Sequence, residues 1–221
     1  MSIRTRIKLC GITRAEDAHS AVSAGVDALG FIFAEKSQRK VDPDQARRII
    51  RDLPPFVDAV GVFVNSDPAR VRELVEYCGL TLVQLHGQES VEYCRTMPVR
   101  VVKAFSVRPD TNDREFAPYA GVVTGFLFDT WHEKLAGGTG QVFDWSMLAK
   151  FAILRPLVLA GGLGPDNIGA AVRQVRPFAV DVNSGVEVAA PGVKEHGLIM
   201  AVVRAVRRVD LEIYGEEGNP A

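Results

Sequence analysis

Two residues of this 221-residue chain combine a reactive side chain with a place at the end of an apolar run. Cys10 ends the run 7–10 and is followed at once by Gly11, and Asp129 ends the run 125–129. A thiolate can remove a proton and a carboxylic acid can donate one, so the two residues are candidates for a base and an acid. The alternatives are a small buried hydrophobe at Cys10 and, at Asp129, a carboxylate held by the amides of the next loop.

Three further polar residues stand beside apolar runs, where they could contact a ligand. Arg39 lies in a basic loop after the run 28–33, and its guanidinium could hold a carboxylate by two hydrogen bonds or remain a solvated cation. Asp181 stands between two valines, so it points away from them and must recognise a donor or belong to a buried ion pair. His86 ends the run 82–86, and its contact with a ligand is left open.

Glycine-rich segments follow two of the later apolar runs. They are residues 161–164 and residues 183–185. Glycines beside the start of a helix expose backbone N–H groups, which bind phosphate with the help of the helix dipole. Either segment alone is typical of a tight turn, but the two together predict a phosphate site.

Short β-branched runs alternate with amphipathic helical segments along the chain, which is typical of a mostly parallel sheet. Eight runs end 19 to 31 residues apart, about one βα unit each. A doubly wound sheet would have five or six strands, so eight near-equal units favour an α/β protein with a single (β/α)₈, or TIM, barrel. The expected strands are 7–10, 28–33, 59–64, 82–86, 99–105, 122–129, 157–160 and 178–182. The expected helices are 15–24, 44–53, 68–78, 90–97, 145–151, 166–175 and 194–209.

Such a barrel keeps its chemistry at the end where the strands have their carboxyl termini, here called the mouth. The first and sixth strands lie well apart around the ring, so Cys10 and Asp129 could hold a substrate from two sides. We expect one barrel over residues 1–209 and a frayed polar tail over residues 210–221.

The composition excludes several classes of partner. The 26 basic and 27 acidic residues form no long run of one sign, which argues against nucleic acid and membrane surfaces. No apolar run approaches the roughly 20 residues of a transmembrane helix, and the first residues show no signal-peptide pattern. The three cysteines, Cys10, Cys78 and Cys94, are an odd number without the spacing of metal ligands, so we expect a reducing, cytoplasmic setting.

The same segments match a known family. The chain resembles phosphoribosylanthranilate isomerase, a tryptophan-pathway enzyme that performs an Amadori rearrangement. Each motif is weak alone, but their combination and order over about residues 6–200 are specific. The motifs are KLCGIT, GFIF followed by KSQR, GVFVN, VQLHG, FLFDT, GGTGQVFDW, LAGGL and VDVNSGVE.

The resemblance implies a role for each candidate residue. Cys10 would be the general base that removes the proton from C2′, and Asp129 the general acid that protonates the ribose ring oxygen. Arg39 would hold the anthranilate carboxylate, and Asp181 would lie near the substrate nitrogen. The phosphate would bind backbone amides around four residues, Gly161, Gly162, Ser184 and Gly185.

The resemblance also implies a phosphorylated small-molecule substrate, no metal or organic cofactor, and a monomer or homodimer. The chemistry agrees, because an aldose-to-ketose shift needs one proton added at oxygen, one removed at carbon, and no redox cofactor. Lys8 precedes Cys10 by two residues on the same side of a strand, so it is a candidate for raising the thiolate fraction.

Two other functions are the alternatives. A bifunctional isomerase of histidine and tryptophan synthesis is similar in its phosphate loops, but it has an aspartate in the first strand where this chain has Cys10. A barrel that binds a phosphorylated ligand without converting it would lack Cys10 or Asp129, and both residues are present.

Overall fold

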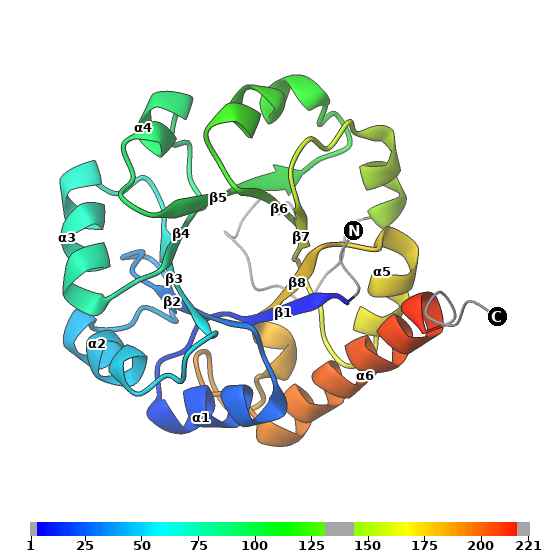
Figure 1. Cartoon of the computed structure of the whole chain (residues 1–221), viewed down its shortest axis with the longest axis horizontal. Coiled ribbons are helices and arrows are strands. Elements are labelled where there is room, and N and C mark those ends of the chain that lie inside the picture. Colours follow the sequence, from blue (N-terminus) through cyan, green and yellow to red (C-terminus); the bar gives the residue numbers. More distant parts are fainter. Residues whose placement is uncertain (1–3, 131–143, 216–221) are drawn as a thin grey trace.

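Eight parallel strands close into a barrel with helices around its outside, as Figure 1 shows for a computed structural model of the chain. The structure describes residues 4–130 and 144–215. The strands follow one another around the ring in sequence order, and the first pairs with the last to close it. The expected single (β/α)₈ barrel is therefore confirmed.

The strands are short and lie close to the expected runs. The largest difference is at the sixth strand, which begins at Gly125 because Val122 and Val123 bond to Tyr119 in the preceding turn. The strands are β1 (Arg6–Leu9), β2 (Ala28–Ile32), β3 (Asp58–Phe63), β4 (Leu82–Leu85), β5 (Arg100–Val107), β6 (Gly125–Thr130), β7 (Leu157–Leu159) and β8 (Ala179–Val182).

Local signals in the sequence set the ends of several helices. Asp42 and Asp67 cap α2 and α3 by accepting backbone hydrogen bonds, and each is followed by a proline at the first helical position. Gly25 ends α1 in the left-handed conformation, with φ of 89°. The α-helices are α1 (Ala15–Ala24), α2 (Pro43–Arg51), α3 (Pro68–Cys78), α4 (Val91–Arg95), α5 (Ile168–Val175) and α6 (His196–Tyr214). The short 3₁₀ helices are η1 (Asp113–Glu115), η2 (Ala117–Gly121), η3 (Trp145–Lys150) and η4 (Ser184–Val186).

The apolar core lies mainly between the strands and the surrounding helices. Val180 and Val182 of β8 belong to this outer core, so strand alternation turns Asp181 to the inside of the ring. Two small apolar clusters lie on the inner side. One contains Ala104, Leu127, Val158, Ala160 and Ala179, and the other contains Cys10, Ile32 and Val62.

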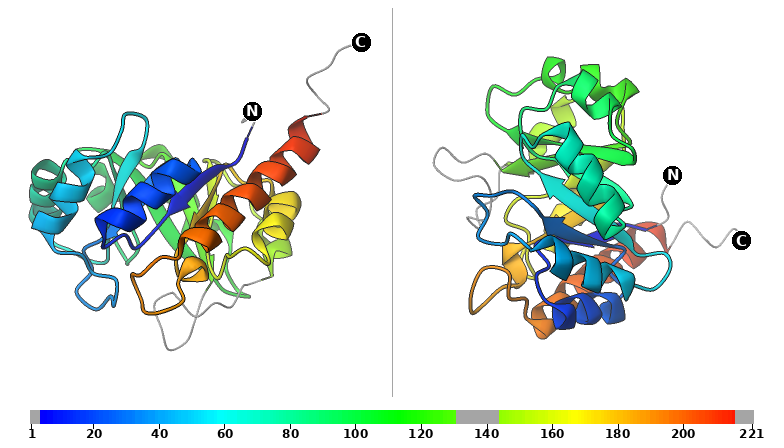
Figure 2. Two further views of the ribbon diagram at one scale, coloured as in Figure 1. Left: turned by 90° about the horizontal axis from the view of Figure 1, so that it is seen from below. Right: turned by 90° about the vertical axis from the view of Figure 1, so that its left-hand side faces the viewer.

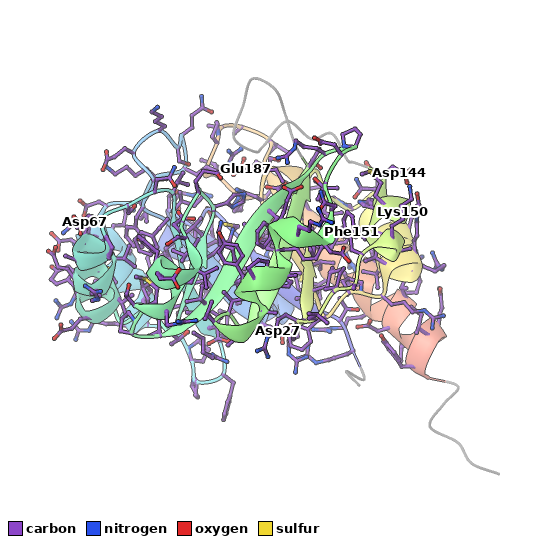
Figure 3. The ribbon with its side chains drawn as sticks, turned by 90° about the horizontal axis from the view of Figure 1, so that it is seen from above. Asp27, Asp67, Asp144, Lys150, Phe151 and Glu187 are labelled. Carbon is purple, nitrogen blue, oxygen red and sulfur yellow. The ribbon has the colours of Figure 1, made fainter. Side chains whose placement is uncertain are left out.

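The two ends of the barrel carry different groups. Figure 3 places Glu187, after β8, and Asp27, before β2, at opposite ends. The left view of Figure 2 shows the loop after β2 and the loop after β8 extending from one end, which is the mouth. At the other end, Asp27 binds Arg4 and accepts a hydrogen bond from the backbone N–H of Ile7 at 2.9 Å. This arrangement follows the rule that the mouth carries function and the opposite end carries stability.

The expected boundary between barrel and tail at residue 209 is wrong, because α6 continues to Tyr214. Asp210 is buried and accepts a hydrogen bond from the backbone N–H of Thr5 at 2.9 Å. Arg207 donates to the Thr5 carbonyl at 3.0 Å. These contacts tie the start of β1 to the last helix, and the polar composition of the segment gave no sign of them. Residues 216–221 of the expected tail lie outside the described residues.

Candidate active site

β1 and β8 place Lys8 and Asp181 beside the Cys10 thiol. The Cys10 N–H donates to the Val182 carbonyl at 2.8 Å, which fixes Cys10 directly after β1. Lys8 and Asp181 are register partners, and the Lys8 Nζ lies 2.7 Å from the Asp181 Oδ2. Of the two alternatives for Asp181, the structure therefore contains the buried ion pair. The second oxygen, Oδ1, is also buried and has no hydrogen-bond partner in the part of the chain that the structure describes.

Burial and charge act in opposite directions on these three groups. Burial raises the pKa of the Cys10 thiol above its ordinary value, and the neighbouring Lys8 opposes that shift. Burial also raises the pKa of Asp181, again against the effect of Lys8. Although burial lowers the pKa of the Lys8 ammonium, Asp181 and Cys10 together raise it above its usual value. Lys8 is therefore a fixed positive charge beside the thiol.

Asp129, at the end of β6, is held from two sides. Its Oδ1 accepts a hydrogen bond from the Thr130 N–H at 2.7 Å, and its Oδ2 lies 3.4 Å from the His86 Nε2. The Gln84 amide nitrogen lies 3.0 Å from the His86 Nδ1 and can only donate, so Nδ1 accepts. The proton of the neutral ring is then on Nε2, which faces Asp129. Asp129 and His86 are also close enough to act electrostatically on Asp181.

Arg39 is bound to a carboxylate of the protein itself. Its Nε donates to Glu187 Oε1 at 2.9 Å, and its Nη2 donates to Glu187 Oε2 at 2.7 Å. The side chain of Arg39 is only 14% exposed, so the solvated cation is not the state observed. Glu187 occupies the Nε and Nη2 side of the guanidinium. A ligand carboxylate would therefore bind at the Nη1 end.

Lys194 fixes Glu187 from the opposite direction. Its Nζ donates to Glu187 Oε1 at 2.8 Å and to the carbonyl and side-chain oxygens of Asn183 at 3.0 and 2.8 Å. The Gly192 N–H donates to the same Glu187 oxygen at 2.8 Å. Burial raises the pKa of Glu187, but the hydrogen bonds from Arg39, Lys194 and Gly192 together hold it below its usual range. Glu187 is therefore an anion that orients Arg39.

The two glycine-rich segments contact each other at the mouth. Gly161 and Gly162 have φ of 88° and 63°, a region that favours glycine. A Cβ on Gly161 would lie 2.2 Å from the Thr130 Oγ1, and one on Gly185 would lie 2.0 Å from the Leu163 carbonyl oxygen. Neither position tolerates a side chain, so the loops after β7 and β8 pack together beside β6. Ser184 begins the turn η4 next to Gly185.

The mouth brings most of the expected residues together, and the sequence missed three of their partners. Alternation along β4 could have indicated Gln84, which stands two residues before His86. Glu187 ends a segment already singled out, but nothing indicated that it binds Arg39. Lys194 had no local signal at all, because its partners depend on the path of the loop after η4.

The described part of the structure contains no candidate metal centre and no helix that could span a membrane. No group of three or more histidine, cysteine or acidic side chains is arranged to hold a metal within residues 4–130 and 144–215. No helix of these same residues is long and apolar enough to cross a bilayer. The three cysteines are all buried and free.

Comparison with known proteins identifies the family. A sequence model of the family described as N-(5'phosphoribosyl)anthranilate (PRA) isomerase matches residues 7–205. The N-(5'-phosphoribosyl)anthranilate isomerase of Trichlorobacter lovleyi is 50% identical over 201 residues, which are 90% of this chain and 96% of that protein. The enzyme of the same name from Pelobacter propionicus is 46% identical over 207 residues, 94% of this chain and 98% of its own. The chain belongs to the phosphoribosylanthranilate isomerase family.

Solved phosphoribosylanthranilate isomerases have the same fold. The Thermotoga maritima structure has a TM-score of 0.81 at 42% identity and covers 92% of this chain and 99% of its own. The Thermus thermophilus structure has a TM-score of 0.82 at 36% identity, with coverages of 93% and 100%. A phosphoribosyl anthranilate isomerase in complex with reduced 1-(o-carboxyphenylamino)-1-deoxyribulose 5-phosphate has a TM-score of 0.78 at 42% identity, covering 92% and 99%.

Proposed function

We propose that Cys10 and Asp129 are the base and the acid with which this chain isomerises N-(5'-phosphoribosyl)anthranilate in tryptophan biosynthesis. The observation that carries the proposal is the position of a thiol beside a fixed positive charge and of a carboxyl group beside a histidine, both at one barrel mouth. The product is 1-(2-carboxyphenylamino)-1-deoxyribulose 5-phosphate, and the reaction is an Amadori rearrangement.

The rearrangement needs two proton transfers at opposite sides of the ribose. Asp129 gives its proton to the ring oxygen, the bond from that oxygen to C1′ breaks, and an iminium forms between C1′ and the anthranilate nitrogen. The Cys10 thiolate then removes the proton from C2′ to give an enolamine, which tautomerises to the ketone. The Nε2–H of His86 stabilises the negative charge that remains on Asp129, and no redox cofactor or metal takes part.

The remaining candidates bind the substrate at its two anionic ends. Arg39 binds the anthranilate carboxylate with the end of its guanidinium that Glu187 does not use. The phosphate accepts hydrogen bonds from backbone N–H groups where the two glycine-rich loops meet, around Gly161, Gly162, Ser184 and Gly185. Asp181 turns its unpartnered oxygen Oδ1 toward the substrate nitrogen.

A direct assay tests the function. Phosphoribosylanthranilate generated in situ is mixed with the purified protein, and the loss of its anthranilate-type fluorescence is followed. Conversion at a rate proportional to protein concentration supports the proposal, and binding without conversion would support the non-catalytic barrel instead. The same protein is offered the phosphoribosyl isomerase substrate of histidine synthesis. We expect no turnover, because the bifunctional enzymes have an aspartate where Cys10 stands.

We further propose that the protein works in the cytoplasm as a monomer or homodimer. Both forms occur among the solved relatives, since one Thermotoga maritima structure is described as monomers generated from a dimeric enzyme. Light scattering on the eluted peak of a sizing column distinguishes the two states of this chain.

Replacement of Arg39 by lysine is expected to raise KM about 10- to 100-fold with a smaller change in kcat. Lysine keeps the positive charge but loses the planar fork that Glu187 orients, and a charge-assisted hydrogen bond contributes about 1.5–3 kcal/mol. Steady-state kinetics measure the effect. The matched control is Arg51→Lys, the same substitution at an exposed residue of α2. Unchanged kinetics in Arg39→Lys would mean that the Arg39–Glu187 pair is only structural.

Replacement of Gly162 by valine is expected to raise both the KM of the substrate and the inhibition constant of inorganic phosphate, each about tenfold or more. A side chain at positive φ strains the loop and displaces the amides that hold the phosphate. Gly121→Val is the control, because a Cβ there meets no atom within 4 Å. A folded Gly162→Val protein with wild-type values of both constants would refute the phosphate site.

A further inference from the structure

The environment of Cys10 works against the role proposed for it. A general base must be a thiolate, but burial favours the neutral thiol. Toward β2 and β3, Cys10 belongs to a small apolar cluster with Ile32 and Val62. A thiol in such surroundings becomes a base only if a nearby positive charge compensates for the lost hydration. The following inference rests on the proposed role of Cys10.

We propose that the Lys8 ammonium is the positioning group that stabilises the Cys10 thiolate, and that Asp181 anchors Lys8 for this purpose. The three side chains then form one unit, in which Lys8 stands between a permanent anion and an anion that appears when the thiol loses its proton.

Gly30 of β2 shows how close the thiol and the ammonium are. A Cβ placed on Gly30 would lie 2.7 Å from the Cys10 Sγ and 3.1 Å from the Lys8 Nζ. The sulfur and the ammonium therefore border the same position beside Gly30, which only a glycine leaves free for them. Lys8 and Cys10 also stand two residues apart on the same strand, which turns both to the inside of the barrel.

Two lysines are close enough to act on Cys10, and their hydrogen bonds distinguish them. Lys194 has three N–H groups, and the three acceptors already described, two on Asn183 and one on Glu187, use all of them. Lys8 has the same number of donors, but within the described part of the chain it has one oxygen acceptor, Asp181 Oδ2. Lys8 therefore has N–H groups left for a thiolate, and Lys194 does not.

The remaining charged groups around the thiol support this assignment. Asp181 is the anion nearest to Lys8, and its own charge raises the pKa of Cys10. Asp129 of β6 and His86 after β4 also act electrostatically on Asp181. Arg39 is bound to Glu187, so its charge is neutralised in place. Without Lys8, the pKa of the Cys10 thiol would rise still further, because burial and the charge of Asp181 would lose the largest influence that opposes them.

The test measures the thiol directly, without relying on turnover. Alkylation of the full chain by iodoacetamide is followed as a function of pH, and the modified cysteines are identified by peptide mass mapping. Burial raises the pKa of both Cys78 and Cys94 to about 11, so they serve as internal references. In Lys8→Met we expect the midpoint of Cys10 alkylation to rise by about one pH unit or more, and the rising limb of kcat/KM to move with it.

Two further variants separate charge from structure. Lys8→Arg is expected to keep a midpoint close to that of wild type, because arginine retains the positive charge. Lys36→Met removes a positive charge from the exposed loop after β2 and is expected to leave the Cys10 midpoint unchanged. A shift of equal size in Lys36→Met would overturn the assignment to Lys8.

A double variant keeps the test valid if Lys8→Met fails to fold with Asp181 unpaired. The midpoint of Cys10 alkylation is then compared between Asp181→Asn and the double variant Lys8→Met/Asp181→Asn. The double variant removes both charges of the ion pair, so it leaves neither one buried without its partner. Equal midpoints in these two proteins would overturn the proposal, and a higher midpoint in the double variant would support it. If alkylation shifts but the limb of kcat/KM does not, the coupling of Lys8 to the thiol holds and the role of Cys10 as the base is refuted.

Discussion

Replacement of Cys10 by serine is expected to lower kcat about 10²- to 10⁴-fold, the usual contribution of a general base. A hydroxyl group has far too high a pKa to remove a proton from carbon unaided, and Lys8 cannot lower it enough. Cys10→Ala should be at least as poor, yet both variants should bind a product analogue nearly as well as wild type. Single-turnover kinetics and titration of the analogue separate the two effects.

The pH profile gives a second measurement of the same group. A base must be deprotonated to act, so the rising limb of kcat/KM belongs to Cys10. Burial raises the pKa of this thiol, so the limb should lie at higher pH than for a free cysteine, and activity should fall as the pH drops below it. The limb should disappear from whatever activity Cys10→Ser retains.

A matched variant shows whether the thiol matters as chemistry or as packing. Cys94 is also buried, at 2% exposure against 4% for Cys10, but it lies in α4, on the outside of the barrel (Figure 1). Cys94→Ser should lose some thermal stability and keep its kcat. If Cys10→Ser behaves in the same way, stable and fully active, Cys10 is a core residue and the proposed mechanism fails.

Replacement of Asp129 by asparagine is expected to lower kcat by a similar factor, about 10² to 10⁴. An amide cannot deliver a proton to the ring oxygen, although it has nearly the shape of the acid and can still accept the hydrogen bond of the Thr130 N–H. The fold and the KM should therefore change little. Steady-state kinetics measure kcat, and circular dichroism with thermal unfolding shows whether the protein is intact.

Asp27→Asn is the control at the opposite end of the barrel. Asp27 is also bonded to cations and to a backbone N–H, but these contacts hold β1 and the chain before it. Despite burial, the bonds to Arg4 and Ile7 lower the pKa of Asp27, so its stabilising effect is present at neutral pH and is lost as the pH falls. Asp27→Asn should lower the melting temperature without lowering kcat. A normal kcat in Asp129→Asn would refute its role as the acid.

The sequence predicts the barrel because the signals for strands and helices are local. Runs of β-branched residues, prolines after aspartate and a glycine after a helix each determine a short segment without help from distant residues. Cys10 and Asp129 could be found in the same way, since a polar residue that ends an apolar run is visible in the run itself. Strand alternation alone also placed Asp181 inside the ring, where Lys8 meets it.

The contacts between distant loops could not be predicted in this way. Arg39 and Glu187 are 148 residues apart, and they meet only because the ring brings the loops after β2 and β8 to the same side. The fork of Arg39 was expected to be open for a ligand, whereas a buried guanidinium requires a partner within the protein. The tail was misjudged for a similar reason, because Asp210 is polar in sequence and becomes a buried acceptor only against Thr5.

The pairing of Lys8 with Asp181 has a consequence for the synthesis of the protein. The two residues are 173 positions apart, and the contact between Thr5 and Asp210 spans 205. At roughly 5–20 residues per second, a ribosome needs on the order of 10 to 30 seconds to advance from Lys8 to Asp181. Throughout that interval the ammonium has no carboxylate to bury against, so β1 must stay hydrated on the nascent chain. The catalytic mouth is therefore completed in one late step, when β8 and α6 have emerged.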